Sequence, residues 1–93
     1  MSIEITKSAE ETYRRVLNTL EVKYEGKEFF VLIDDDDNGG SISVYDKEKN
    51  VVYDEDITEA IQDCFTEYRE TSELTQGKKF IKDKEYDCWE EAN

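Results

Sequence analysis

The chain has no histidine and no proline, and only two of its 93 residues are cysteines. Without histidine, imidazole catalysis and the commonest side-chain ligand of metal ions are both excluded. Two cysteines without Cys-x-x-Cys spacing form neither a disulfide framework nor a zinc site, so we expect Cys64 and Cys88 to be structural. No run approaches the roughly 18 apolar residues of a membrane-spanning helix, and residues 1–30 lack the pattern of a secretory signal. We therefore expect a cytoplasmic protein.

Basic residues are scarce as well. Only 12 lysines and arginines stand against 25 aspartates and glutamates, which gives a net charge of −13. Such a chain has no cationic excess with which to bind nucleic acid directly, and anionic membrane surfaces repel it. It also has no Gly-rich phosphate loop and no nucleophile motif, and its acids lie where nothing would desolvate them. We expect a single acidic domain over residues 1–93 that is not an enzyme and has no catalytic residues and no cofactor.

Hydrophobic periodicity predicts an α+β fold. A capping box at Ser8-Ala9-Glu10-Glu11, followed by apolar residues at helical spacing, predicts a first main helix over residues 8–20. Alternating or β-rich segments predict strands. The strands are expected at residues 2–6, 20–24, 29–33, 41–45 and 51–53, with a polar loop at 34–40. Short connections favour a three- or four-stranded antiparallel meander.

Two more helices are expected after the meander. The second main helix begins near residue 56 with Asp56 as its N-cap, and it ends at residues 71–72 or at 76, where Gly77 would cap it. A short C-terminal helix is expected over residues 83–92. Both main helices should pack on one face of the sheet. Tyr86 and Trp89 either cap the core or form a dimer contact, so the oligomeric state is open between a monomer and a homodimer.

The acidic excess is confined to the middle of the chain. Residues 34–76 contain 14 acidic and 3 basic residues, residues 1–33 contain 6 and 5, and residues 77–93 contain 5 and 4. On the second main helix, Glu59, Asp63 and Glu67 are spaced four residues apart and therefore lie on one face. Like charges at this spacing destabilise a helix, and a merely solvated face would carry lysines between them. The pattern therefore indicates a binding surface.

We expect this surface to bind a basic protein, with its carboxylates standing in for phosphate groups. The partner-binding residues are Asp34, Asp35, Asp36, Asp37, Asp54, Glu55, Asp56, Glu59, Asp63, Glu67 and Glu70. The aspartate-rich segment fits no complete EF-hand loop, because the position of the bidentate glutamate is Tyr45 in one register and Asp46 in the other. We therefore expect no metal site there.

In size, element order and charge, the chain resembles the small phage-encoded anti-CRISPR inhibitors of type II effector nucleases and, more loosely, phage anti-restriction DNA mimics. The segments that carry the likeness are the loop 34–37, the strands 41–45 and 50–53, and the helix 56–70. The resemblance implies an acidic DNA mimic that occupies the cationic nucleic-acid groove of a nuclease, such as the PAM-reading groove of a CRISPR effector, and inhibits it in the host cytoplasm.

Two other interpretations of the charge stay open. An immunity protein or a small adaptor would use the same acidic surface to bind a basic protein unrelated to nucleic acid. A small housekeeping domain would carry its acids only for solubility.

Overall fold

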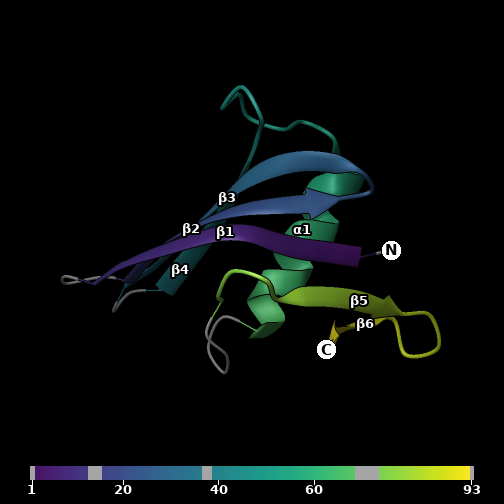
Figure 1. Ribbon diagram of the computed structural model, residues 1–93. Coiled ribbons are helices and arrows are strands. Elements are labelled where there is room, and N and C mark those ends of the chain that lie inside the picture. The colour runs from purple at the N-terminus through teal and green to yellow at the C-terminus, as the bar shows by residue number, and fades with distance from the viewer. Residues whose placement is uncertain (1, 13–15, 37–38, 69–73, 93) are drawn as a thin grey trace.

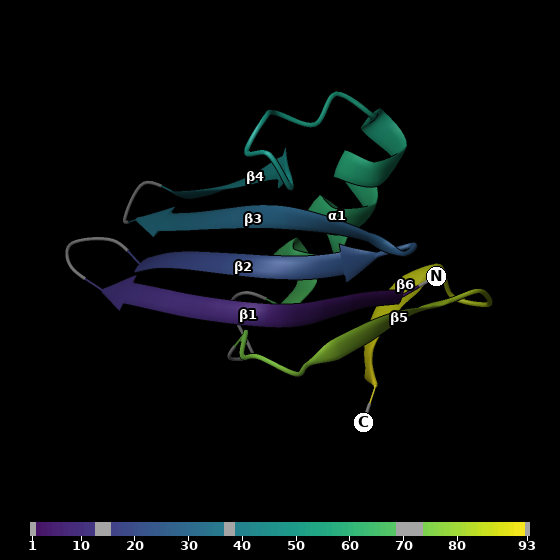
Figure 2. The same cartoon turned by 45° about the horizontal axis from the view of Figure 1, so that its top comes forward.

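The computed structural model describes residues 2–12, 16–36, 39–68 and 74–92, which form one antiparallel sheet and one helix (Figure 1). The elements are β1 (Ser2–Thr12), β2 (Val16–Tyr24), β3 (Lys27–Asp36), β4 (Gly39–Asp46), α1 (Glu55–Tyr68), β5 (Lys79–Asp83) and β6 (Cys88–Ala92). The order across the sheet is β4-β3-β2-β1-β5-β6, and each neighbouring pair is antiparallel. The sheet curls around α1, so that both of its outer strands contact the helix (Figures 1 and 2).

The core lies between the sheet and α1. Its buried hydrophobic residues come from every strand, from α1 and from the segment before β5: Ile3, Ile5, Leu20, Val22, Tyr24, Phe29, Val31, Ile33, Val44, Ile61, Cys64, Phe65, Leu74, Phe80 and Trp89. Phe65 of α1 meets Phe80 of β5 edge-on, with ring centroids 5.9 Å apart. Tyr24 of β2 meets Trp89 of β6 in the same way at 6.4 Å. These contacts join the C-terminal hairpin to α1 and to β2 within one apolar interior.

Side chains of α1 also form one hydrogen bond with the backbone at each of the two edges of the sheet. At one edge, Gln62 Nε2 donates a hydrogen bond of 2.9 Å to the carbonyl oxygen of Ile42 in β4. At the other edge, the N–H of Trp89 in β6 donates to Glu67 Oε2 at 3.3 Å. Unpaired groups on outer strands are sites of unwanted strand addition. The helix therefore supplies the core and also satisfies backbone groups at both edges.

The second main helix of the sequence analysis is confirmed as α1, although Asp56 is not its N-cap. The side chain of Asp54 accepts hydrogen bonds from the N–H groups of Asp56 and Ile57 at 3.0 and 3.4 Å, which is the N-cap arrangement. The described part of the helix runs to Tyr68; the predicted end at 71–72 lies outside the described residues, and residues 74–76 are not helical, so the alternative end at 76 is wrong. Among the described residues, no helix has both the length and the apolar character needed to cross a bilayer.

The predicted first helix over residues 8–20 is wrong. Residues 8–12 belong to β1 and residues 16–20 to β2, and the two strands pair with Ser8 opposite Leu20 and Ala9 opposite Thr19. Of the apolar residues at helical spacing, Leu20 is buried in β2 while Ala9 is exposed in β1, and β2 gains a second neighbour in β3 along its whole length. Pairing between distant segments thus overrides the local helical pattern.

The predicted C-terminal helix is wrong for a similar reason. Residues 83–92 form the end of β5, a turn and β6, and Asp83 Oδ1 accepts the N–H of Glu85 at 2.8 Å within that turn. Asp87 has a φ of 54°, which ends any helical path. Trp89 is buried in the core, while Tyr86 in the turn is 72 % exposed. The second strand of this hairpin brings Trp89 to the core.

The predicted sheet is correct in part. The segments 20–24, 29–33 and 41–45 lie in consecutive antiparallel strands, but 51–53 contributes only an isolated bridge between Val51 and Tyr45. Asp34, Asp35 and Asp36 are in β3 and not in a loop. The α+β meander with two main helices and a C-terminal helix is therefore replaced by a six-stranded curled sheet with one helix among the described residues.

The N-cap can be tested by two single substitutions. Asp54→Ala removes the cap and should lower the free energy of unfolding by about 1 kcal/mol. Asp56→Ala removes an equal charge from the first helical turn without removing a cap, and should lower it by only about 0.3 kcal/mol. Urea titration of both variants gives the comparison, and an equal loss in the two would contradict the assignment of Asp54.

Candidate protein-interaction surface

The exposed side of α1 carries a group of carboxylates, here called the acidic face: Asp54, Glu55, Asp56, Glu59, Asp63 and Glu67. Successive helical residues are rotated by about 100°, so the five members within α1 fall within about 120° of its circumference. The buried residues Ile61, Cys64 and Phe65 lie on the opposite side. From Glu55 to Glu67 the axis rises about 18 Å. The core contacts of α1 therefore point this row of carboxylates into solvent.

No base interrupts the acidic face, because residues 50–68 contain neither lysine nor arginine. The ion pairs within the described residues lie elsewhere, for example Lys78–Glu91 at 3.8 Å and Lys82–Asp87 at 3.2 Å. Each like-charged pair four residues apart costs an isolated helix about 0.2–0.5 kcal/mol. Carboxylates near the end of a helix also meet its negative pole. The packing of the opposite side must offset these costs.

Two members of the acidic face have structural partners. Asp54 caps the helix, and Glu67 accepts the N–H of Trp89. Within the described part of the chain, the side chains of Glu55, Asp56, Glu59 and Asp63 form neither a hydrogen bond nor an ion pair. These four carboxylates are therefore available to an external cationic group.

The predicted aspartate cluster is not part of the acidic face. Asp34 and Asp35 are half-buried in β3, opposite Ser41 and Gly40 at the start of β4. The chain reaches α1 from the other end of β4, which is about 20 Å away along an extended strand. Asp36 ends β3, and Asp37 and Glu70 lie outside the described residues. The structure brings together six of the eleven predicted residues and separates the aspartate cluster from the first turn of α1.

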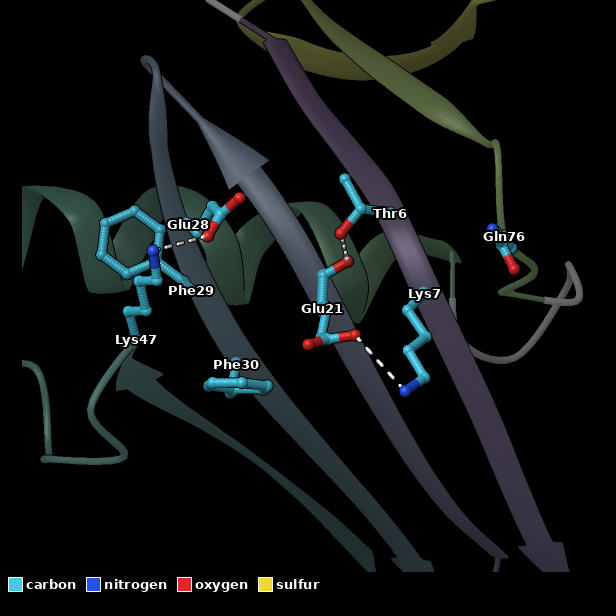
Figure 3. Close-up of a pocket in the computed structure, with 8 residues that line it drawn as sticks. All are labelled: Thr6, Lys7, Glu21, Glu28, Phe29, Phe30, Lys47 and Gln76. Atoms are coloured by element: carbon cyan, nitrogen blue, oxygen red, sulfur yellow. Dashed lines mark hydrogen bonds and ion pairs between the residues drawn. The ribbon is translucent and has the colours of Figure 1, made fainter.

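A second surface, which the charge pattern does not reveal, is the side of the sheet turned away from α1, here called the open face. Figure 3 shows Lys7, Glu21 and Phe30 on this side, in front of α1, around an open hollow of about 610 Å³. Thr6 Oγ1 donates to the carbonyl oxygen of Glu21 at 2.9 Å, and Lys7 Nζ lies 3.9 Å from Glu21 Oε2. One feature of the sequence does point to an apolar open face, because the unbroken apolar run 29–33 is typical of a strand with two apolar faces.

The two thiols and one tyrosine have perturbed acidity. Burial, and secondarily the charge of Glu67, raises the pKa of the Cys64 thiol. Burial also raises the pKa of Tyr24, with smaller contributions from Glu25 and Asp56. The pKa of Cys88 is raised in the same direction, first by desolvation and then by acidic neighbours such as Glu90. A raised pKa disfavours the reactive thiolate form of both cysteines.

No group of three or more His, Cys, Asp or Glu side chains placed to hold a metal ion occurs in residues 2–12, 16–36, 39–68 and 74–92. In comparisons with known proteins, no family model, no curated protein and no solved structure matches this chain. The acidic face and the open face are the two candidate interaction surfaces of the described residues.

The Glu67 contact can be tested by stability. Glu67→Ala leaves the N–H of buried Trp89 without its partner and should lower the free energy of unfolding by about 1–3 kcal/mol. Glu67→Gln keeps an oxygen acceptor and should lose much less. Glu59→Ala, which removes an equal charge from the same face, should stay within about 0.5 kcal/mol of wild type. Equal losses at Glu67 and Glu59 in urea titrations would show that the hydrogen bond contributes nothing.

Cys64 should make stability depend on pH in the alkaline range. Its pKa is raised in the folded state, so the neutral thiol stabilises the fold below its ordinary value of 9.0, and this contribution is lost as the pH rises above that value. The free energy of unfolding should fall by up to about 1.4 kcal/mol per pH unit for this one group. In Cys64→Ala the decline between pH 9 and 10 should be shallower, and parallel curves for the two proteins would exclude the effect.

Proposed function

We propose that this protein is an inhibitor that binds, through the acidic face, the cationic groove in which a nuclease holds nucleic acid. The observation that carries the proposal is the set of four exposed carboxylates, Glu55, Asp56, Glu59 and Asp63, which have no cationic partner within the described residues. Lysine and arginine side chains of a nucleic-acid groove are arranged for a row of anionic oxygens, and a row of carboxylates offers the same sign of field. The proposed target is a nuclease such as a CRISPR effector or a restriction enzyme.

The rigidity of α1 supports this function. Ile61 and Phe65 fix the helix in the core, while Gln62 and Glu67 tie it to both edges of the sheet. A preorganised row of charges loses little conformational entropy on binding. Charge complementarity also accelerates encounter with a cationic partner and makes the binding sensitive to salt. Grooves of this kind belong to enzymes that act on DNA in the cytoplasm of a bacterial cell, which is where we place this protein.

The acidic face is confined to one helix, and this favours a second candidate function. A basic protein unrelated to nucleic acid offers an equally good partner for a row about 18 Å long. Asp34 and Asp35, which a more extensive DNA mimic would add, lie on a different element. The second candidate is therefore an immunity protein or small adaptor, and competition by DNA separates the two functions.

The test uses capture from a bacterial lysate and one matched pair of variants. The tagged wild-type protein should retain a nuclease or another protein with a nucleic-acid groove, should release it on addition of duplex DNA, and should inhibit its cleavage of DNA. The combined substitution Glu55→Gln, Glu59→Gln and Asp63→Asn should weaken binding by about 3- to 150-fold, since each exposed ion pair contributes about 0.2–1 kcal/mol.

The control has the same change of net charge elsewhere. Glu48→Gln, Glu85→Gln and Glu90→Gln neutralise three exposed acids outside α1 and should leave binding within about twofold of wild type. Equal weakening by both triple variants would mean that net charge, and not the acidic face, controls binding. A partner that DNA does not displace would support the immunity protein or adaptor.

A further inference from the structure

A row of side chains crosses the open face from β1 to the segment that follows β4. Strand register places Lys7 opposite Glu21, Glu21 opposite Phe30, and Phe30 opposite Tyr45. An isolated bridge places Val51 opposite Tyr45. Directly opposed residues of antiparallel strands point to the same side of the sheet. The row is therefore charged on β1 and β2, and it is apolar on β3, β4 and Val51.

The apolar end of this row belongs to an exposed strip, here called the apolar strip, which consists of Phe30, Leu32, Tyr45 and Val51. The first three side chains are half-buried and line an open hollow of about 310 Å³, and Val51 is 53 % exposed. Within the described residues no helix covers this side, because α1 lies on the other (Figure 3). Removing a strip of this kind from water favours association with another apolar surface.

The charges around the apolar strip are balanced, unlike those of the acidic face. Lys47 Nζ lies 3.6 Å from Glu28 Oε2, and Lys7 Nζ lies 3.9 Å from Glu21 Oε2. Lys49 borders the hollow as a further cation. A border with lysines and glutamates side by side can meet a copy of itself with opposite charges facing each other. A two-fold symmetric interface requires this kind of self-complementary patch.

We propose that two copies of the chain associate through their open faces, with the apolar strips in contact. Sheets packed face to face lie about 10 Å apart, and each α1 then occupies the outer side of its own sheet. The two acidic faces point away from each other and are separated by both sheets, well beyond the Debye length of about 8 Å at physiological salt. Contact through the acidic faces would instead bring like charges together.

Other occupants of the open face fit the charges less well. A nucleic acid is repelled by the net charge of −13, as a second copy is, but its uniformly anionic backbone offers no lysines to meet the glutamates around the strip. A strongly basic partner is attracted to the acidic face, on the other side of the sheet from the three lysines around the strip. The association of two copies does not depend on the proposed function. If both proposals hold, the dimer presents two outward acidic faces and is bivalent.

Sedimentation equilibrium over a range of concentrations tests the proposal. Wild type should reach twice the chain mass of 11.0 kDa. The dissociation constant should decrease as NaCl is raised, because salt screens the net repulsion between two copies. Binding of a cationic partner to the acidic face should weaken with salt, so the two proposals respond in opposite directions.

A matched set of substitutions locates the interface. Leu32→Glu places a charge in the middle of the apolar strip and should raise the dissociation constant at least tenfold. Tyr86→Glu introduces the same charge at an exposed apolar side chain in the β5–β6 turn and should leave the dissociation constant within about twofold of wild type. If circular dichroism shows that Leu32→Glu does not fold, Val51→Glu gives the same test at a residue outside the strands.

Either of two results would overturn the proposal. One is a wild-type protein that stays at the mass of one chain up to millimolar concentration in both low and high salt. The other is a dimer whose dissociation constant is unchanged by the folded strip variant, because this would place the contact on another surface.

Discussion

The arrangement of this protein depends on one contact, the burial of the apolar side of α1 in the concave side of a curled sheet. Phe65 and Ile61 are fully buried there, and Phe80 and Trp89 reach the same interior from the C-terminal hairpin. The curl lets a single helix contact both outer strands, β4 and β6. Because the core fixes the rotation of α1, it also fixes the direction in which the carboxylates of the acidic face point. The proposed function of those carboxylates therefore depends on the packing of the opposite side of the helix.

The same contact explains why a helix with no basic residue is stable in this chain. The carboxylates of the acidic face repel one another, and each like-charged pair costs about 0.2–0.5 kcal/mol. Full burial of one large apolar side chain contributes about 1.5–3 kcal/mol, and α1 buries Ile61, Cys64 and Phe65. Burial of the apolar side exceeds the repulsion on the exposed side, so the sequence can keep its carboxylates unpaired. Asp54 and Glu67 offset the cost further, since each forms a hydrogen bond that helps to hold the helix in place.

An element is predicted correctly from the sequence when its local pattern and its contacts with distant residues favour the same secondary structure. The helical period after residue 56 and the β-rich run 29–33 fall in this class, and both are found. The stretch 8–20 has a helical spacing that the pairing of β1 with β2 overrides, and 83–92 becomes a hairpin because Trp89 has partners such as Glu67 and Tyr24. Those partners are 22 or more residues away, beyond any local window. The row on α1 was predictable for the same reason as the helix, whereas the place of Asp34 in a strand and not in a loop required the register of β3 with β4.

The way in which the edges are closed determines which surfaces remain for interaction. The carbonyl of Ile42 is bonded by Gln62, the N–H of Trp89 is bonded to Glu67, and Val52 donates to the carbonyl of Val44 at 3.2 Å. These bonds satisfy individual backbone groups on each outer strand, which makes the edges poorer templates for adding a further strand. The two broad faces offer side chains for recognition, and they differ in chemistry because the sheet separates them. The exposed side of α1 carries carboxylates without a lysine or arginine and suits a cationic groove, while the open face is apolar with balanced charges and suits a second copy. A single thin sheet can thus carry two interactions with opposite dependence on salt.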